Sequence, residues 1–208
     1  MDALPQTEPP VEPGASAQWA WALIQHRQTI LPKRLADPGP DVSQLELILR
    51  AASAAPDHRE ILPWRFVVIP AAARARLAEV FGNALLERDP AATPEQVAQA
   101  REKAFRAPVL MLAVVRTGPP DDEIPAGERL LSAGCAVQNM LLMATAMGFA
   151  SALTSGKALQ SPGLRSLFSL APDELAVCFL NLGTAIGHKS LRQRPEPSRY
   201  VSFLATDS

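Results

Sequence analysis

Apolar residues recur along much of the chain at the spacing of α-helices. Leu45, Ile48, Leu49 and Ala52 form one such stripe. Asp41 or Ser43, just before the stripe, can cap a helix that runs through Ala54. The same reasoning predicts further helices over residues 19–27, 71–87, 93–105, 127–147 and 162–170. The chain is therefore expected to be rich in helix.

Short apolar runs between these helices predict four strands, at residues 65–69, 109–115, 149–153 and 175–183. The run 109–115 is apolar at nearly every position, which is typical of a strand buried on both faces. Helices and strands do not alternate strictly along the chain. The pattern therefore favours an α+β fold with a central sheet flanked by helices.

Residues 130–153 carry no charge, which raises the question of a membrane span. Gln138, Asn139 and Thr145 interrupt the apolar run, and Gly148 is a typical helix stop. We therefore expect a central helix packed on all sides within a protein, and no membrane partner.

The composition indicates one globular domain, because 48% of the 208 residues are hydrophobic and 20% are charged. A formal net charge of −1 argues against a nucleic-acid partner, which would require a basic face. Residues 1–17 contain several prolines and acidic residues, so we expect a poorly ordered lead before a domain at 18–208. This lead lacks the basic start and apolar core of a secretory signal, so a cytoplasmic location is expected.

Few residues suggest side-chain catalysis. Cys135 and Cys178 lie in apolar runs and fit buried small hydrophobic residues better than a disulfide or metal site. His26, His58 and His188 have no metal-binding spacing. The chain also lacks a GxSxG nucleophile motif, a P-loop and a GxGxxG turn. We therefore predict no metal site and name no catalytic side chain.

Two basic clusters remain, His26-Arg27-Gln28 with Lys33-Arg34, and a second over residues 189–199. The simplest interpretation is a solvated charged surface. The alternative is a phosphate site, because Arg27 follows an apolar helix directly and a guanidinium can bind phosphate with two parallel hydrogen bonds. Ala55-Pro-Asp-His-Arg59 joins a helix end to a turn that carries a titratable histidine. It could equally be a plain turn in which Asp57 bonds the local backbone.

Together these segments resemble the FMN-dependent nitroreductase family, in its small single-domain subgroup. The resemblance covers about residues 18–203. It is carried by H-R-Q at 26–28, A-P-D-H at 55–58, P-W-R-F at 63–66, F-R-A-P at 105–108, S-A-G-C-A-V-Q-N-M at 132–140, A-M-G-F at 146–149 and L-G-T at 182–184. Their order and spacing give the match its specificity.

The resemblance implies an α+β nitroreductase-like sandwich around a central mixed sheet. It further implies an intertwined homodimer with FMN at the subunit interface and a C-terminal tail that wraps the partner. The implied FMN contacts are His26, Arg27 and Gln28 at the phosphate and ribityl chain, Lys33 or Arg34 nearby, Ala54 and His58 at the partner's flavin, Leu153, Thr154, Ser155 and Gly156 along the ring, and Arg194 or Arg192 at the phosphate. The turn ending at Gly148 would contact the nicotinamide of NAD(P)H.

The chain departs from the family pattern at the phosphate motif. The family usually has two arginines and a serine, whereas His26 and Gln28 replace the first and third of these. Because a histidine is only partly charged at neutral pH, the resemblance implies weaker phosphate binding or compensation by Lys33, Arg34 and the tail.

The implied activity is reduction of nitro compounds, quinones or similar small-molecule acceptors, with NAD(P)H as the hydride donor and FMN as the carrier in a ping-pong scheme. Residues 82–105 and 117–127 would shape the acceptor pocket. The alternatives are a flavin-binding sensor or carrier without turnover, and an interaction module whose basic clusters bind nothing.

Overall fold

The computed structural model describes residues 14–119, 123–187, 189–190 and 192–204. Its helices are α1 (Ala15–His26), α2 (Val42–Ala52), α3 (Arg74–Arg88), α4 (Pro94–Glu102), α5 (Ala126–Ala146) and α6 (Pro162–Leu167). Its strands are β1 (Leu35–Ala36), β2 (Trp64–Val68), β3 (Val109–Arg116), β4 (Ala150–Thr154) and β5 (Glu174–Ala185). Every predicted helix and strand is present with ends shifted by a few residues, and β1 is an addition.

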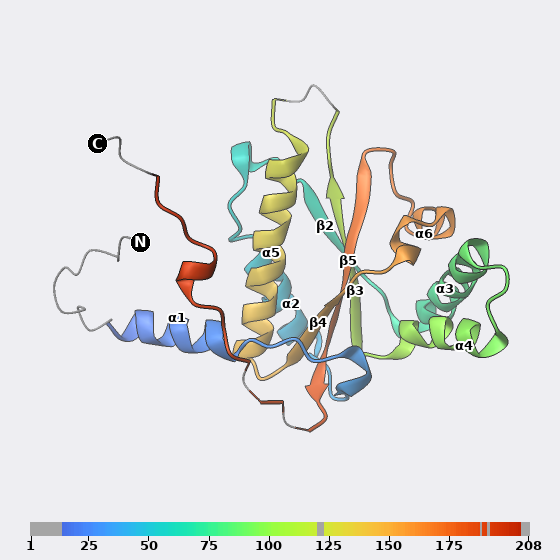
Figure 1. Ribbon diagram of the computed structural model, residues 1–208, viewed down its shortest axis with the longest axis horizontal. Helices are drawn as coiled ribbons and strands as arrows, with labels where there is room; N and C mark the ends of the chain where they lie inside the picture. Colours follow the sequence, from blue (N-terminus) through green and yellow to red (C-terminus); the bar gives the residue numbers. More distant parts are fainter. Residues whose placement is uncertain (1–13, 120–122, 188, 191, 205–208) are drawn as a thin grey trace.

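The strands form one sheet in the order β1-β5-β3-β2, with β4 paired to β5. All pairings between these strands are antiparallel, which corrects our expectation of a mixed sheet. Helix α5 carries the chain from the end of β3 back to the start of β4, so these two strands run in the same direction (Figure 1). Strand β5 lies between them and runs opposite to both, since Asn181 pairs with Leu110 on one side and Ala152 on the other.

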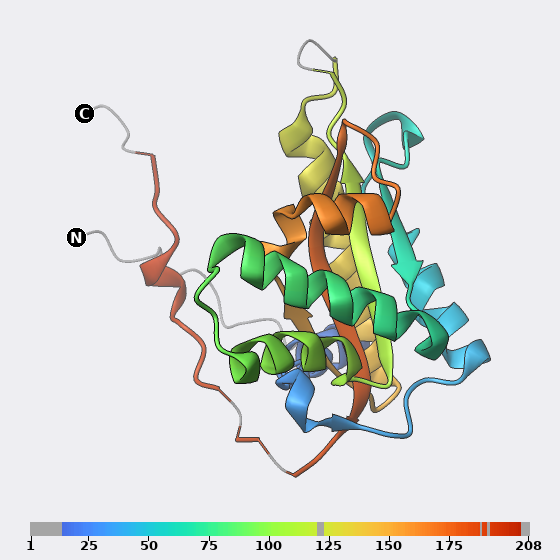
Figure 2. The ribbon, with the colours of Figure 1, turned by 90° about the vertical axis from the view of Figure 1, so that its right-hand side faces the viewer.

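Helices cover both faces of the sheet, with α2 and α5 on one side and α3, α4 and α6 on the other (Figure 2). Alternate residues of β3 pack into two hydrophobic clusters, one on each face of the sheet. Met111 and Ala113 pack in the cluster that contains residues of α2 and α5. Leu110, Leu112 and Val114 pack in the cluster that contains residues of α3 and α6. The prediction that this strand is buried on both faces is confirmed.

Local capping signals in the sequence fix where two helices begin. The Asp41 carboxylate accepts from the Gln44 backbone N–H at 2.8 Å, and the Asp41 N–H donates to the Gln44 side chain at 2.9 Å. Thr93 and Gln96 make the same reciprocal pair at the start of α4. Asp41, rather than Ser43, is therefore the cap of α2.

One side of helix α5 packs against the sheet, and the opposite side of the helix is exposed to solvent. Ala136, Met140 and Ala144 are fully buried, whereas Leu131 is 69% exposed. Gly134 and Gln138, which follow Leu131 on the same side, are also exposed. Within the described chain no helix is both long and apolar enough to cross a bilayer. The central helix is confirmed, but the single chain does not pack it on all sides.

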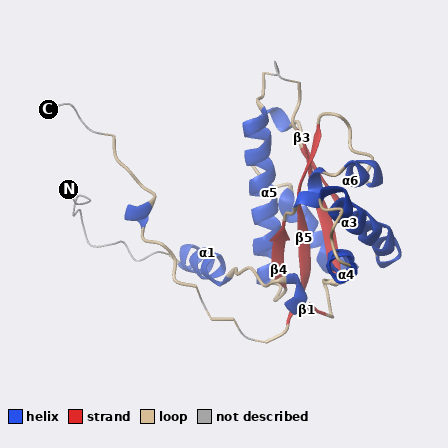
Figure 3. Ribbon diagram, turned by 45° about the vertical axis from the view of Figure 1, so that its right-hand side comes forward, coloured by secondary structure: helices blue, strands red, loops and turns tan. Residues whose placement is uncertain are grey.

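Helix α1 and residues 192–204 extend away from the body of the molecule (Figures 1 and 3). None of the residues of α1 is buried, and Trp19 is 77% exposed. Tyr200 and Phe203 of the tail are similarly exposed. Of the predicted lead, residues 1–13 lie outside the described residues, and residues 15–17 already belong to α1.

Both cysteines are free thiols. Cys178 is buried in the sheet, and desolvation raises the pKa of its thiol to about 11. This state fits the predicted small hydrophobic residue. Cys135 is only partly buried, because it lies between the covered and bare sides of α5.

A buried carboxylate joins the far ends of β2 and β5. Arg65 donates to both oxygens of Glu174, at 2.7 and 2.9 Å, and Glu174 is 7% exposed. The Ala171 backbone N–H donates to the same carboxylate at 3.1 Å. The hydrogen bonds from Arg65 are the largest cause of a Glu174 pKa lowered to about 2.

We predict that Glu174 contributes stability above pH 4.5 and that this contribution disappears as the pH falls towards 2. The sign follows because the folded pKa lies below the unfolded value, so acid protonates the unfolded chain first. Glu174→Gln should lower the free energy of unfolding at pH 7 by about 2 kcal/mol, allowing for the partial exposure of Arg65. Urea unfolding at pH 7 and pH 3 measures the difference.

The control is Asp173→Asn, which removes the more exposed carboxylate next to Glu174. This substitution should change the free energy of unfolding by less than about 0.5 kcal/mol. An equal loss from Glu174→Gln at both pH values would contradict the assignment.

Candidate functional site

The segment after α1 is attached to the start of β4. Thr29 forms an isolated parallel bridge with Ser151, and the Ile30 N–H donates to the Ser151 carbonyl at 2.9 Å. Lys189 extends from the tail and donates to the Thr29 carbonyl at 2.6 Å. These bonds bring the first basic cluster, β4 and the tail to one end of the sheet.

Two arginines from distant parts of the sequence meet at this end. The Arg194 guanidinium donates to the backbone carbonyl of Arg27 at 3.0 Å and lies near that of Gln25 at 3.4 Å. Burial and then the positive charge of Arg194 lower the pKa of the Arg27 guanidinium from its usual value. Among the described residues no carboxylate pairs with Arg27, Lys189 or Arg194. Like charges held together without a counterion are favourable only beside an anion.

His26 and Gln28 flank this cluster and border a cavity of about 740 Å³. The His26 ring donates through Nδ1 to the Ala22 carbonyl of its own helix at 2.9 Å. The Gln28 Oε1 atom is buried without a hydrogen-bond partner in the described structure, and so is the Ser151 hydroxyl. A buried acceptor without a partner is costly, so a ligand that donates to Gln28 would stabilise the folded protein. Gly148, the expected nicotinamide contact, borders the same cavity.

A second cavity, of about 650 Å³, lies between the end of β4 and the helix pair α3–α4. Thr154, Ser155 and Gly156 form part of its wall. Leu31 and Pro32 also line it, so the segment 26–32 borders both cavities. This continuity joins the cationic cluster to the strand end where the resemblance places the flavin ring.

Asn181 organises the wall of this second cavity. Its amide, 2% exposed, donates to the Thr154 hydroxyl at 3.1 Å and to the Ala152 carbonyl at 3.3 Å. Asn181 is absent from the residues predicted from the sequence, although an amide within the apolar run F-L-N-L-G is a signal for it.

Four cations that line the same cavity were also not singled out, namely Arg88, Lys103, Arg106 and Lys157. They are scattered along the sequence, and only the folding of α3 and α4 over the strand end brings them together. Part of the predicted acceptor region 82–105 thus lines this cavity, whereas no described residue of 117–127 lines either cavity.

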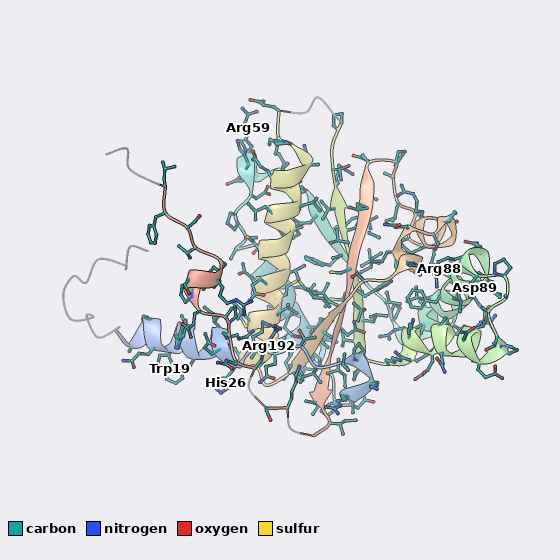
Figure 4. All side chains as sticks on the ribbon, in the orientation of Figure 1. Trp19, His26, Arg59, Arg88, Asp89 and Arg192 are labelled. Carbon is teal, nitrogen blue, oxygen red and sulfur yellow. The ribbon has the colours of Figure 1, made fainter. Side chains whose placement is uncertain are left out.

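The structure places the alternative residues of the basic clusters in different surroundings. Lys33 and Arg34 are exposed in a 3₁₀ turn at Pro32–Arg34, and, like Arg27 and Arg194, neither of them lines a cavity. Arg192 is exposed, whereas Arg194 is partly buried beside Arg27. Figure 4 labels Arg192 and His26 on this side of the molecule. Arg194 is therefore the tail residue that belongs to the cluster.

His58 lies at the first turn of α5, beside Glu128, whereas His26 borders a cavity with Thr145 and Ala146 at the other end of that helix. Figure 4 labels Arg59, which follows His58, at the end of the molecule opposite to His26. His58 Nδ1 is 2.8 Å from the Glu128 carboxylate, and both side chains are about half exposed. Within one chain these residues do not meet the cationic cluster.

The turn that carries His58 is bound to its own backbone. Asp57 accepts from the Leu62 N–H at 2.7 Å, which confirms the local role considered for it. Arg59, Glu60 and Leu62 have positive φ angles, a conformation that non-glycine residues rarely adopt. The turn is therefore a strained, specifically built loop rather than a flexible connection.

Comparisons with known proteins agree with this architecture. The model of the family described as "Nitroreductase family" matches residues 24–184. The chain is 35% identical over 172 residues to an Escherichia coli (strain K12) protein named "Putative NAD(P)H nitroreductase YdjA", covering 82% of this chain and 92% of that protein.

Two solved structures share the fold. One is a nitroreductase-like family protein from Bacillus cereus, with a TM-score of 0.77, 18% identity and coverage of 88% of this chain and 95% of that one. The other is the FMN-dependent nitroreductase NfnB from Mycobacterium smegmatis in complex with NADPH, with a TM-score of 0.69, 17% identity and coverage of 91% and 100%. The family match and the E. coli relative together show that the chain belongs to the nitroreductase family.

Proposed function

We propose that the protein is an FMN-containing, NAD(P)H-dependent oxidoreductase that reduces nitro compounds, quinones or similar acceptors. The observation that carries this proposal is the segment 26–32, which holds Arg27 beside Arg194 and borders both cavities, the second of which is also lined by the strand end Thr154–Gly156. The names of its relatives support it, since YdjA is named for NAD(P)H and nitroreduction and NfnB for FMN.

The residues present fit FMN in their chemistry. Arg27 and Arg194 are paired cations without a carboxylate among the described residues, which suits a phosphate. The unpartnered Gln28 Oε1 can accept a hydrogen bond from a ribityl hydroxyl. Leu153 and the backbone of Thr154–Gly156 form an exposed strand end beside a cavity whose walls are partly apolar, which suits a flat ring.

Flavin supplies the redox chemistry when bound, accepting a hydride from a nicotinamide and passing electrons to an acceptor. The chain's own residues bind and orient the flavin and the substrates, and they exclude water. Asn181 holds Thr154 and the Ala152 carbonyl in place, and Phe179 and Leu159 provide the dry wall. Apart from the cofactor, no side chain of the described site is required as a nucleophile.

We further propose a homodimer in which Ala54 and His58 of each subunit face the site of the other. Three bare apolar features support it: the Leu131 side of α5, the exposed tryptophans of α1 and the extended tail with Tyr200 and Phe203. Exposed apolar side chains are typical of interaction surfaces when they gather in a patch, and a second subunit would cover these ones. The strained turn at 57–62 holds His58 outward, half exposed, against Glu128.

The first test of the function is flavin uptake. We expect the protein to purify yellow or to bind added FMN, and then to oxidise NADH or NADPH when a quinone is supplied. Fluorescence titration with FMN and steady-state NAD(P)H oxidation measure the two parts. No change in flavin fluorescence would contradict the proposal, and bound FMN without turnover would instead identify a flavin carrier or sensor.

The second test concerns the phosphate contact. Arg27→Ala should weaken FMN binding about 10-fold to 150-fold, because a charge-assisted hydrogen bond contributes roughly 1.5–3 kcal/mol. His26→Arg should preserve or strengthen binding, because it adds a permanent charge beside the cluster. Flavin fluorescence titration gives both dissociation constants.

Arg192→Ala is the matched control, since Arg192 is exposed and outside the cluster. An Arg27→Ala dissociation constant equal to that of the Arg192→Ala control would remove Arg27 from the site.

The third test examines the shared site by complementation. An Arg27→Ala subunit and a His58→Ala subunit should each be impaired alone, and subunit exchange should restore part of the activity. The reason is that one of the two sites in the mixed dimer then keeps both native residues. A fully active monomer at micromolar concentration in sedimentation would contradict the shared-site proposal.

A further inference from the structure

The cavity beside the β4 end is strongly biased towards positive charge. Arg88 from the end of α3, Lys103 and Arg106 from the turn after α4, and Lys157 after β4 all line it. None of the described residues that line it is an aspartate or glutamate. Figure 4 shows Arg88 on the α3 side of the molecule, away from His26 and Arg192.

These cations are poorly neutralised by the rest of the described chain. Arg106 is paired with Glu102 at 3.1 Å, but its Nε atom is buried without a partner. Arg88, Lys103 and Lys157 form no ion pair with any of the described residues.

Five arginines outside the cavity each form an ion pair with a carboxylate. Arg101 of α4, which does not line the cavity, pairs with Glu79 of α3. The other arginines that pair with a carboxylate away from the cavity are Arg50, Arg59, Arg65 and Arg116. The cavity therefore gathers four cations and no aspartate or glutamate among its described lining residues, and three of these cations lack the carboxylate partner that the five arginines above have.

The remaining walls of the cavity are apolar or neutral. Phe81, Leu85, Leu159 and Phe179 supply apolar surface, and Gln96 and Gln99 supply amides. A ligand with a flat apolar body and a negative group would satisfy both kinds of wall at once. Clefts lined by charge of one sign also raise the local concentration of ions of the opposite sign.

We propose that the acceptor of this enzyme is an anionic aromatic compound, whose carboxylate, sulfonate or phenolate binds the cations at this cavity. The inference rests on the proposed function and specifies its substrate class. Arg88 and Lys157 are assigned to the anion because they lie outside the residues proposed for the flavin.

For a nitro acceptor the overall reaction is ArNO₂ + NAD(P)H + H⁺ → ArNO + NAD(P)⁺ + H₂O. The nicotinamide loses two electrons and the nitrogen gains them. One N–O bond breaks, and its oxygen leaves as water with the two hydrogens from NAD(P)H and H⁺. The anionic group of the acceptor is unchanged, so it contributes to binding and positioning only.

The decisive comparison uses two probes of one shape on the FMN-loaded protein. The 4-nitrobenzoate ion should have a KM about fivefold lower than neutral 4-nitrobenzamide, which corresponds to the contribution of about 1 kcal/mol from one exposed ion pair. Benzoate and benzamide, which cannot be reduced, should show the same preference by calorimetric titration. Arg88→Gln and Lys157→Gln should each remove most of the preference.

Arg76→Gln is the matched control, because Arg76 is an exposed arginine of the same helix that does not line the cavity. It should leave the preference unchanged. Equal KM values and equal binding of the charged and neutral probes would overturn the inference. So would an Arg88→Gln protein that loses affinity for NADPH but keeps its preference for nitrobenzoate, since the cations would then serve the nucleotide phosphates.

The outcome separates this inference from the function on which it rests. A protein that reduces a quinone but shows no preference for anions keeps the proposed function and loses the inference. A protein that binds benzoate over benzamide but reduces neither the nitro compounds nor a quinone keeps the anion site and loses the proposed activity.

Discussion

The arrangement of the site depends on β5, the strand to which β1, β3 and β4 all pair. Its pairing with β4 fixes where residues 154–156 leave the sheet, and β4 in turn holds the segment after α1 through Thr29 and Ser151. Asn181, in the middle of β5, adds side-chain bonds to that same strand end. A single strand thus positions the cationic cluster and the cavity relative to each other, although their residues are far apart in the sequence.

Charge is distributed unequally between the structural and functional parts of the molecule. At the far end of the sheet Glu174 is buried and satisfied by Arg65, an arrangement that serves stability. At the site, Arg27 and Arg194 lie together without such a carboxylate in the described chain. Keeping cations uncompensated costs stability in the free protein, and ligands that bring negative charge recover it. This division is the electrostatic signature expected of a binding site.

Sequence patterns predicted those parts of the fold that local physics determines. The reciprocal bonds of Asp41 with Gln44 and the apolar run of β3 are examples, since caps and strand burial depend on neighbouring residues. The cavity cations were missed because Arg88 and Lys157 acquire a common role only through tertiary structure.

The resemblance named the cluster around Arg27, and the structure then distinguished Arg194 from Arg192 by burial. Lys33 and Arg34, like Arg27 and Arg194, line neither cavity, so their contact with the phosphate stays a prediction. The most direct test of the whole account is a crystal structure of the protein grown with FMN. We predict the phosphate within hydrogen-bond distance of Arg27 and Arg194 and the ring against Thr154–Gly156. Flavin density at any other position on the protein would contradict the account.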